Sequence, residues 1–115
     1  MKKFKFSLEK VRQLREARLE SEQALLRGLL AEKAAVQRRR MELEEYEMQA
    51  MEELRLKQVV EVEELTALES FRRFAGMERG RLKAAAASLD GRIELQRQAL
   101  VAARRQVEAL NSLRE

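Results

Sequence analysis

The sequence has no cysteine, no histidine, no proline and no tryptophan, and only four of its 115 residues are glycine. Without cysteine there can be no disulfides, thiolate metal sites or thiol nucleophiles. Without histidine the usual general base and the commonest metal ligand are missing. The only aspartate is Asp90, so paired carboxylates would have to come from glutamate. Because no combination of acid, base and nucleophile is present, we expect a protein that is not an enzyme and has no metal site and no cofactor.

Long apolar runs are absent as well. The opening M-K-K-F-K-F-S-L carries lysines with no apolar segment behind them, which argues against a signal peptide. No stretch approaches the ~18 uninterrupted apolar residues that a membrane-spanning helix needs. We therefore expect a cytoplasmic protein.

The residues that are present favour long helices. Charged residues make up 38% of the chain, hydrophobic residues 45% and aromatic residues only 4%. The apolar share is too high for a disordered chain. Abundant alanine, glutamate, leucine, arginine and lysine are typical of coiled coils. The composition predicts an all-α protein with one domain over residues 1–115.

The chain is expected to fold back once, near its middle. Helix formers run from Leu8 to Glu115, and Ser7 has the side chain of an N-cap residue. The weakest helical stretch is residues 57–62, where three valines lose side-chain freedom in a helix. A turn near residues 57–62 predicts two helices, about 8–56 and about 63–114, paired as an antiparallel coiled-coil hairpin. The alternative turn, at residues 76–80, would leave arms of very unequal length.

Heptad spacing supports this turn. On a grid of alternating steps of four and three residues, ten of the fourteen positions in the second arm are apolar. The fourteen grid positions are Leu68, Arg72, Ala75, Arg79, Leu82, Ala86, Leu89, Ile93, Gln96, Leu100, Ala103, Val107, Leu110 and Arg114. This register passes through the three glycines of the second arm without a slip, as an unbroken helix would.

The first arm has a less regular grid, with eight apolar positions among thirteen. The thirteen grid positions are Leu8, Val11, Arg15, Arg18, Glu22, Leu25, Leu29, Glu32, Val36, Arg39, Leu43, Tyr46 and Ala50. With a fold axis near residues 59–60, Gly28 would face Gly91, a pairing that permits a close approach of the two backbones.

Charge is segregated along the chain. Residues 1–40 have a net charge of +7, residues 42–69 of −8 and residues 70–115 of +5. A hairpin would therefore have an acidic turn and a basic terminal end, a polarity that orients a protein toward charged partners. The alternative is that these charges are ordinary solvated helix faces.

The aromatic residues lie where a coiled-coil core would not need them. Phe71 and Phe74 fall off the second-arm grid, three residues apart on one helix face. Across the hairpin we expect Tyr46, Met48 and Met51 beside them. An exposed apolar patch rimmed by charge is typical of a protein–protein contact site. The alternative is that the two phenylalanines cap the coiled coil where its helices splay toward the turn.

The opening F-K-F-S-L-E-K-V-R-Q-L-R-E, from Phe4 to Glu16, resembles the start of the flagellar export protein FliJ family. That family opens with F-x-F and a short helix with spaced leucine and valine that ends near Arg-Glu. The F-R-R-F segment at residues 71–74 is similar to the family's aromatic cluster early in the second helix. The two arms expected here are nearly equal, whereas the family's second helix is usually longer. The stalk proteins of type III secretion injectisomes are similar in kind and remain an alternative.

The resemblance implies a non-enzymatic stalk, similar to the central stalk of rotary ATPases. Its terminal end would enter the ring of the flagellar export ATPase, and it would contact the cytoplasmic domain of the export gate and escort export chaperones. It would associate with the inner membrane at the flagellar base only through these partners. The family's gate-binding positions map onto Leu43, Tyr46, Phe71 and Phe74.

For the ATPase ring we expect contacts from the basic terminal end, where positive charge concentrates. The candidate residues are Arg12, Arg15, Arg18, Arg104 and Arg105. Two alternatives of other classes remain open. A basic coiled coil, with Arg38–Arg40 as a phosphate contact, would bind nucleic acid with a steep salt dependence, although the export role predicts no nucleic acid partner. A purely structural coiled coil would instead form a stable oligomer.

Overall fold

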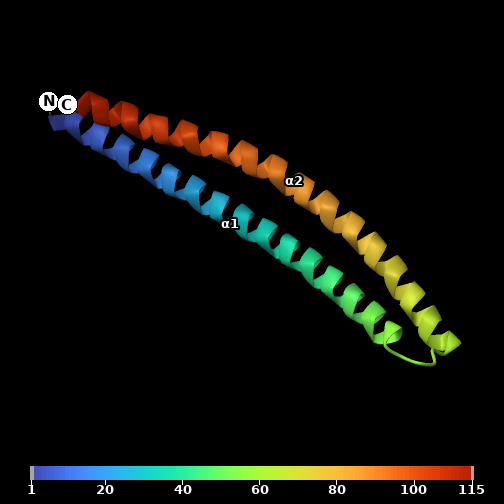
Figure 1. Ribbon diagram of the computed structural model, residues 1–115. Helices are drawn as coiled ribbons and strands as arrows, with labels where there is room; N and C mark the ends of the chain where they lie inside the picture. The colour runs from blue at the N-terminus through green and yellow to red at the C-terminus, as the bar shows by residue number, and fades with distance from the viewer. Residues whose placement is uncertain (1, 115) are drawn as a thin grey trace. The chain divides into compact units, whose positions relative to one another are not determined.

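The computed structural model describes residues 2–114, and it describes side chains for residues 7–113. Helix α1 spans Lys2–Arg55 and helix α2 spans Val62–Arg114, with a turn at residues 56–61 between them (Figure 1). No strand is present in this described range. The all-α hairpin with its turn near residues 57–62 is confirmed. Helix α2 runs without a break through Gly76 and Gly80, so the alternative turn is wrong.

Ordinary backbone hydrogen bonds end α1 and begin α2 on either side of the turn. The N–H of Leu56 donates to the carbonyl of Glu52 (3.1 Å). The N–H of Lys57 donates to the carbonyl of Leu54 (3.2 Å), three residues earlier, which is the 3₁₀-type bond that ends α1. The carbonyl of Glu61 accepts the first bonds of α2, from the N–H of Glu64 at 3.1 Å and from the N–H of Leu65 at 3.2 Å. Two of the valines that predicted the turn, at positions 59 and 60, lie inside it.

The predicted start of the first helix is wrong. Helix α1 begins at Lys2 and passes through Ser7, which is therefore not an N-cap residue. Once a helix is nucleated, each further residue adds a hydrogen bond at little cost. No proline or glycine between Lys2 and Ser7 opposes that extension, so one capping residue does not stop it.

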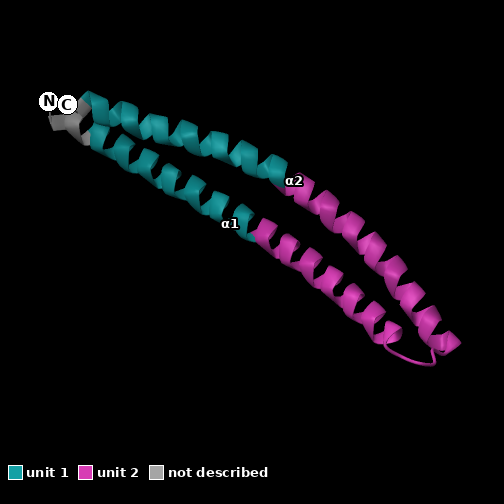
Figure 2. Cartoon of the chain, viewed as in Figure 1, with its two compact units in different colours: residues 1–31, 90–115 teal, residues 32–89 magenta. Residues whose placement is uncertain are grey.

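The chain forms two compact units, each built from a segment of α1 and a segment of α2 (Figure 2). Unit 1 comprises residues 1–31 and 90–115, and unit 2 comprises residues 32–89. In unit 1, Arg15 contacts Gln106 and Glu22 contacts Gln96, so the two segments run antiparallel. Unit 2 contains the turn, and its two segments are antiparallel as well.

The predicted register of the second helix agrees with the burial of its side chains. Every buried residue of α2 lies on the expected grid: Ala75, Leu82, Leu89, Ile93, Ala103 and Leu110. In unit 2, Ala75 and Leu82 pack with Leu43 of α1, and Val36 packs against this cluster. Apolar burial of this kind supplies the main driving force for pairing the two segments.

The first-arm register is correct at every second position and wrong by one residue at the others. The buried residue of α1 and most of its half-buried ones repeat in steps of four and then three from Leu8: Leu8, Arg12, Arg15, Leu19, Glu22, Leu26, Leu29, Lys33, Val36, Arg40, Leu43, Glu47, Ala50 and Leu54. The prediction began with a step of three and so selected exposed residues such as Val11, Leu25 and Tyr46. The grid was chosen to include apolar residues, but six of the positions that face α2 are charged, so it selected exposed apolar neighbours in their place.

The predicted close approach at Gly28 and Gly91 is also wrong. A Cβ atom placed on either glycine would have no atom of the other helix within 4 Å. A methyl group therefore fits at both positions, and neither glycine is needed to bring backbones together.

Candidate partner-binding surfaces

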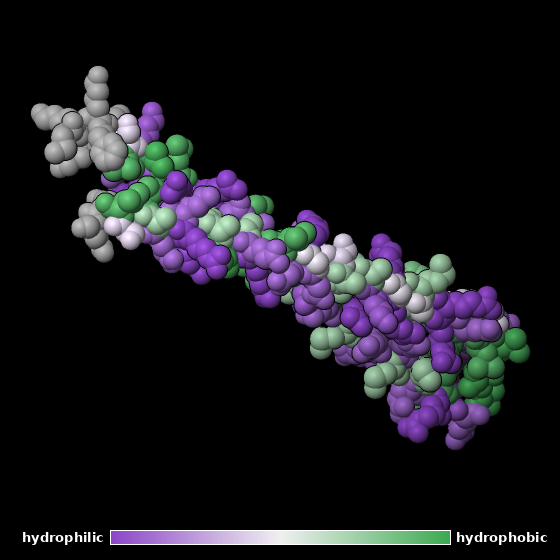
Figure 3. All heavy atoms as spheres, turned by 90° about the horizontal axis from the view of Figure 1, so that it is seen from above, coloured by the Kyte–Doolittle hydropathy of each residue, from purple (hydrophilic) through white to green (hydrophobic). Residues whose placement is uncertain are grey.

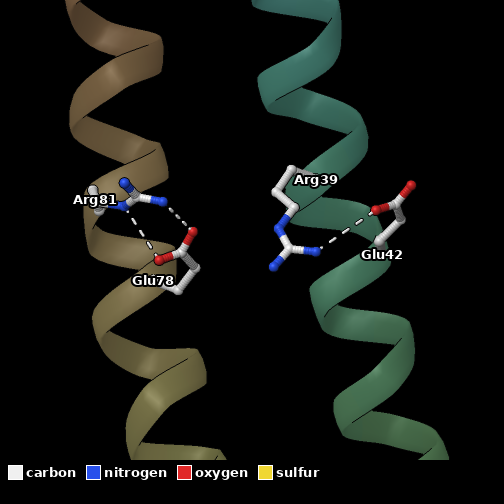
Figure 4. A network of polar contacts seen from close by, with 4 residues as sticks. All are labelled: Arg39, Glu42, Glu78 and Arg81. Carbon is white, nitrogen blue, oxygen red and sulfur yellow. Dashed lines mark hydrogen bonds and ion pairs between the residues drawn. The ribbon is translucent and has the colours of Figure 1, made fainter.

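One flank of unit 2 carries the exposed aromatic side chains. Arg39 of α1 and Glu78 of α2 both lie on this flank (Figure 4), and Arg39 is close enough to act on the Glu78 charge. Tyr46 is seven residues after Arg39, and Phe71 is seven residues before Glu78. Seven residues are two helical turns, so Tyr46 and Phe71 occupy the equivalent positions one heptad nearer the turn.

We call Tyr46, Phe71 and Phe74 the aromatic flank. Tyr46 is 57% exposed and Phe74 is 51% exposed, while Phe71 is half-buried. Phe74 is one turn beyond Phe71 on the same side of α2. The structure therefore brings three of the four predicted gate-side residues to one solvent-facing surface.

The fourth predicted residue lies elsewhere. Leu43 is only 2% exposed and belongs to the core of unit 2 with Ala75 and Leu82. Its side chain therefore forms no part of an exposed patch. The sequence did not separate Leu43 from Tyr46, because both fell on the expected first-arm grid.

The network beside the aromatic flank is ionic. Arg81 donates to Glu78 at 2.6 Å, and Arg39 lies 3.9 Å from Glu42 (Figure 4). The hydrogen bond from Arg81, followed by the charges of Arg81 and Arg39, holds the pKa of the Glu78 carboxyl below its ordinary value.

The methionines expected in the same patch face another direction. Met48 is two residues from Tyr46, and residues two apart on a helix do not share a face. Met48 and Met51 instead line a separate groove of about 550 Å³ close to the turn. We call it the turn groove; its lining is Met48, Met51, Glu52, Leu54, Arg55, Val60, Leu65 and Leu68. Sequence reasoning missed it, because finding it requires the register of both helices.

The residues around the turn are strongly acidic. Residues 42–69 contain ten glutamates and only two basic residues, Arg55 and Lys57. Arg55 pairs with Glu52 at 2.8 Å, and Lys57 pairs with Glu64 at 2.6 Å. The hydrogen bond to Glu64 raises the pKa of the Lys57 ammonium. Both local cations are therefore already neutralised by neighbouring carboxylates.

Glu47 ties the two helices of unit 2 together. Its half-buried carboxylate lies 3.5 Å from Arg72 and also accepts a hydrogen bond from Arg79. A further groove of about 550 Å³ opens beside these three residues. It shares Leu65 and Leu68 with the turn groove, and its other lining residues are Glu69 and Arg73, which pair at 3.0 Å. Its charges are thus satisfied within the unit.

Two of the predicted ring-contact arginines are engaged inside unit 1. Arg12 pairs with Glu9 and Glu16, although its buried Nε has no partner. Arg15 donates to the backbone carbonyl of Gln106 at 3.0 Å. Both side chains lie on the face of α1 that is turned toward α2.

The other three predicted arginines are more accessible. The Arg18 side chain is 67% exposed and lies 3.9 Å from Glu22. Arg104 and Arg105 are exposed on α2, with no ion pair to a described side chain. Unit 1 therefore presents Arg18, Arg104 and Arg105 as its available positive charges among the five candidates.

No family model, curated protein or solved structure matches the chain. Within residues 2–114, neither helix has an apolar stretch long enough to cross a membrane. The described side chains also include no group of three or more acidic residues arranged to hold a metal ion.

Proposed function

We propose that the protein is a non-enzymatic coiled-coil stalk of a type III protein export apparatus of the flagellar kind. It binds the export ATPase through unit 1 and the cytoplasmic domain of the export gate through the aromatic flank, and it escorts export chaperones. The observation that carries the proposal is the exposed aromatic flank on an antiparallel hairpin, in a chain whose opening resembles the flagellar export family. The stalk works at the cytoplasmic side of the inner membrane, held there by its partners.

The chemistry of the aromatic flank suits a protein partner. Tyrosine and phenylalanine supply a large contact area with few rotatable bonds, and they are enriched at the energetic centres of interfaces. Here Tyr46 and Phe74 are exposed although the chain has few aromatic residues. The ion pairs Arg39–Glu42 and Arg81–Glu78 border the flank. A surface with aromatic anchors and a charged rim is the usual anatomy of a specific interface.

Unit 1 suits the ATPase ring for electrostatic reasons. It contains 13 basic and 8 acidic residues, whereas unit 2 contains 11 and 12. Exposed arginines at Arg18, Arg104 and Arg105 steer the unit toward an acidic surface and pair there with carboxylates. A stalk in an injectisome would use the same two surfaces, and affinity for the gate domain of each system distinguishes these roles.

Binding to the purified gate domain tests the first contact. We expect Tyr46→Ala/Phe74→Ala to weaken gate binding by at least about tenfold, because exposed aromatic anchors dominate such interfaces. Helicity should be unchanged, since neither side chain is buried. The matched control is Met41→Ala/Leu56→Ala, which removes two exposed side chains of unit 2 away from the aromatic flank. Equal gate affinity of the two variants, or no binding by the unaltered chain, would refute the assignment.

The export ATPase hexamer provides the reciprocal arm of the same experiment. Arg104→Glu/Arg105→Glu should lose affinity for the hexamer and keep affinity for the gate, with the opposite pattern for the aromatic variant. Arg38→Glu/Lys83→Glu applies the same charge change to unit 2 and should affect the hexamer little. If duplex DNA binds the chain as tightly as the hexamer at moderate salt, the nucleic acid alternative replaces this proposal.

A further inference from the structure

The turn groove is lined by apolar side chains from both helices and the turn. Met48, Met51 and Leu54 succeed one another at intervals of three residues and form a row along α1. Leu65 and Leu68 form the facing row on α2, and Val60 of the turn lies at the end of the groove. Figure 3 shows hydrophobic atoms gathered at the turn end and bordered by hydrophilic ones.

This groove is exposed where a core would be closed. Met48 is 71% exposed and Met51 is 44% exposed, and Leu65 is also exposed. Methionine is flexible and polarisable, so it adapts to apolar side chains of differing shape. Two facing rows of this kind can accept the apolar stripe of an amphipathic helix, whose contacts recur at i, i+3, i+4 and i+7.

The charges around the groove specify the polar face of that helix. Each basic residue close to it is matched to a carboxylate: Arg55 to Glu52, Arg72 to Glu47 and Arg73 to Glu69. Residues 42–69 together hold ten glutamates against two basic residues, and Glu53 and Glu61 share the Lys57 charge with Glu64. The uncompensated charge is therefore negative, and the C-terminal end of α1 adds its own negative dipole end.

We propose that the turn groove binds a basic amphipathic helix of a partner protein, with its apolar stripe between Met51 and Leu65 and its lysines or arginines toward the excess carboxylates of residues 42–69. The same charge disfavours the other occupants. A second copy would bring its own turn segment of net charge −8 and would be repelled. An anionic lipid surface would be repelled for the same reason. The groove lies on the flank away from Tyr46, so this proposal does not depend on the export role.

A model peptide tests the proposal directly. The probe is a fluorescent peptide of about 18 residues, made of leucine and lysine, with leucine at i, i+3, i+4 and i+7. Two comparison peptides have the same composition in scrambled order, or glutamate in place of lysine. We expect the full chain to bind the basic amphipathic peptide at least about tenfold tighter than either comparison peptide. Binding should weaken as salt rises from about 0.05 to about 0.5 M.

Variants locate the site. Met48→Ser/Met51→Ser should weaken binding of the basic amphipathic peptide by at least about tenfold. The control Met41→Ser/Met77→Ser changes two exposed methionines outside the groove and should bind as the unaltered chain does. Circular dichroism should show both variants equally helical.

Three results would overturn the proposal. The scrambled peptide could bind as tightly as the amphipathic one, which would show that net charge alone, without an apolar stripe, explains the binding. The two methionine variants could bind equally. Sedimentation could show a dimer of the unaltered chain that Met48→Ser/Met51→Ser dissociates, which would assign the groove to a second copy.

Discussion

At the scale of single residues, Glu47 shows how charge replaces apolar packing inside the hairpin. It occupies a position of α1 that faces α2, where leucine or valine is usual in a coiled coil. Its carboxylate is half-buried and is held by Arg72 and Arg79. Both arginines are more than one third exposed, so solvent screens a good part of the attraction.

We expect Glu47→Gln to lower the free energy of unfolding of the chain by about 1 kcal/mol, because the amide keeps the shape but loses charge-assisted bonds to two guanidinium groups. Urea unfolding followed by circular dichroism measures the change. The matched control is Glu53→Gln, an exposed glutamate near the same end of α1, for which the change should stay within about 0.5 kcal/mol. Indistinguishable midpoints for the two variants would show that the Glu47 pairs add nothing to stability.

At the scale of elements, the two helices differ in how well their sequences reveal their registers. Helix α2 has apolar residues at most facing positions, so heptad spacing alone predicts its buried residues. Helix α1 has charged residues at six of its facing positions: Arg12, Arg15, Glu22, Lys33, Arg40 and Glu47. Several of these are satisfied by groups on α2, such as the side chain of Gln96, which donates to Glu22. Such pairings depend on the partner helix, so the pattern of α1 alone cannot show them.

The neighbouring leucines 25 and 26 distinguish the two registers of α1. Leu25 lies on the expected grid but is 57% exposed, whereas Leu26 is half-buried on the face turned toward α2. We expect Leu26→Ala to lower the free energy of unfolding by about 1–2 kcal/mol, because the substitution removes apolar contacts of a side chain that is only half-buried. Leu25→Ala should cost less than about 0.5 kcal/mol. If Leu25→Ala proved the more damaging in thermal and urea unfolding, the observed register would be wrong.

The turn and the aromatic flank show what local sequence can and cannot predict. The turn follows from the backbone preferences of consecutive β-branched residues, which act locally. The spacing of Phe71 and Phe74 likewise places both on one helix face. The expected grid already placed Leu43 on the core face, and its one-residue error wrongly placed Tyr46 there as well. The turn groove depends on which faces of α1 and α2 meet, so that error also hid the groove.

At the scale of the whole molecule, the two units differ in net charge and in the surfaces that they present. Unit 1 contains both ends of the chain and an excess of positive charge, while unit 2 contains the acidic turn, the aromatic flank and the turn groove. Two surfaces of different character on one unit suit two different partners. Both proposals require that each unit pairs α1 with α2 of the same chain.

Thiol crosslinking tests that requirement most directly, because the natural chain has no cysteine and engineered thiols are the only ones present. The pairs are Glu47→Cys/Arg72→Cys in unit 2 and Glu22→Cys/Gln96→Cys in unit 1, whose side chains meet across the two helices. The exposed pair Met41→Cys/Met77→Cys is the control. With a short thiol-specific crosslinker at low protein concentration, we predict intramolecular links in the first two variants and none in the control. Links only between separate chains, or none in the first two variants, would contradict the hairpin and both binding proposals.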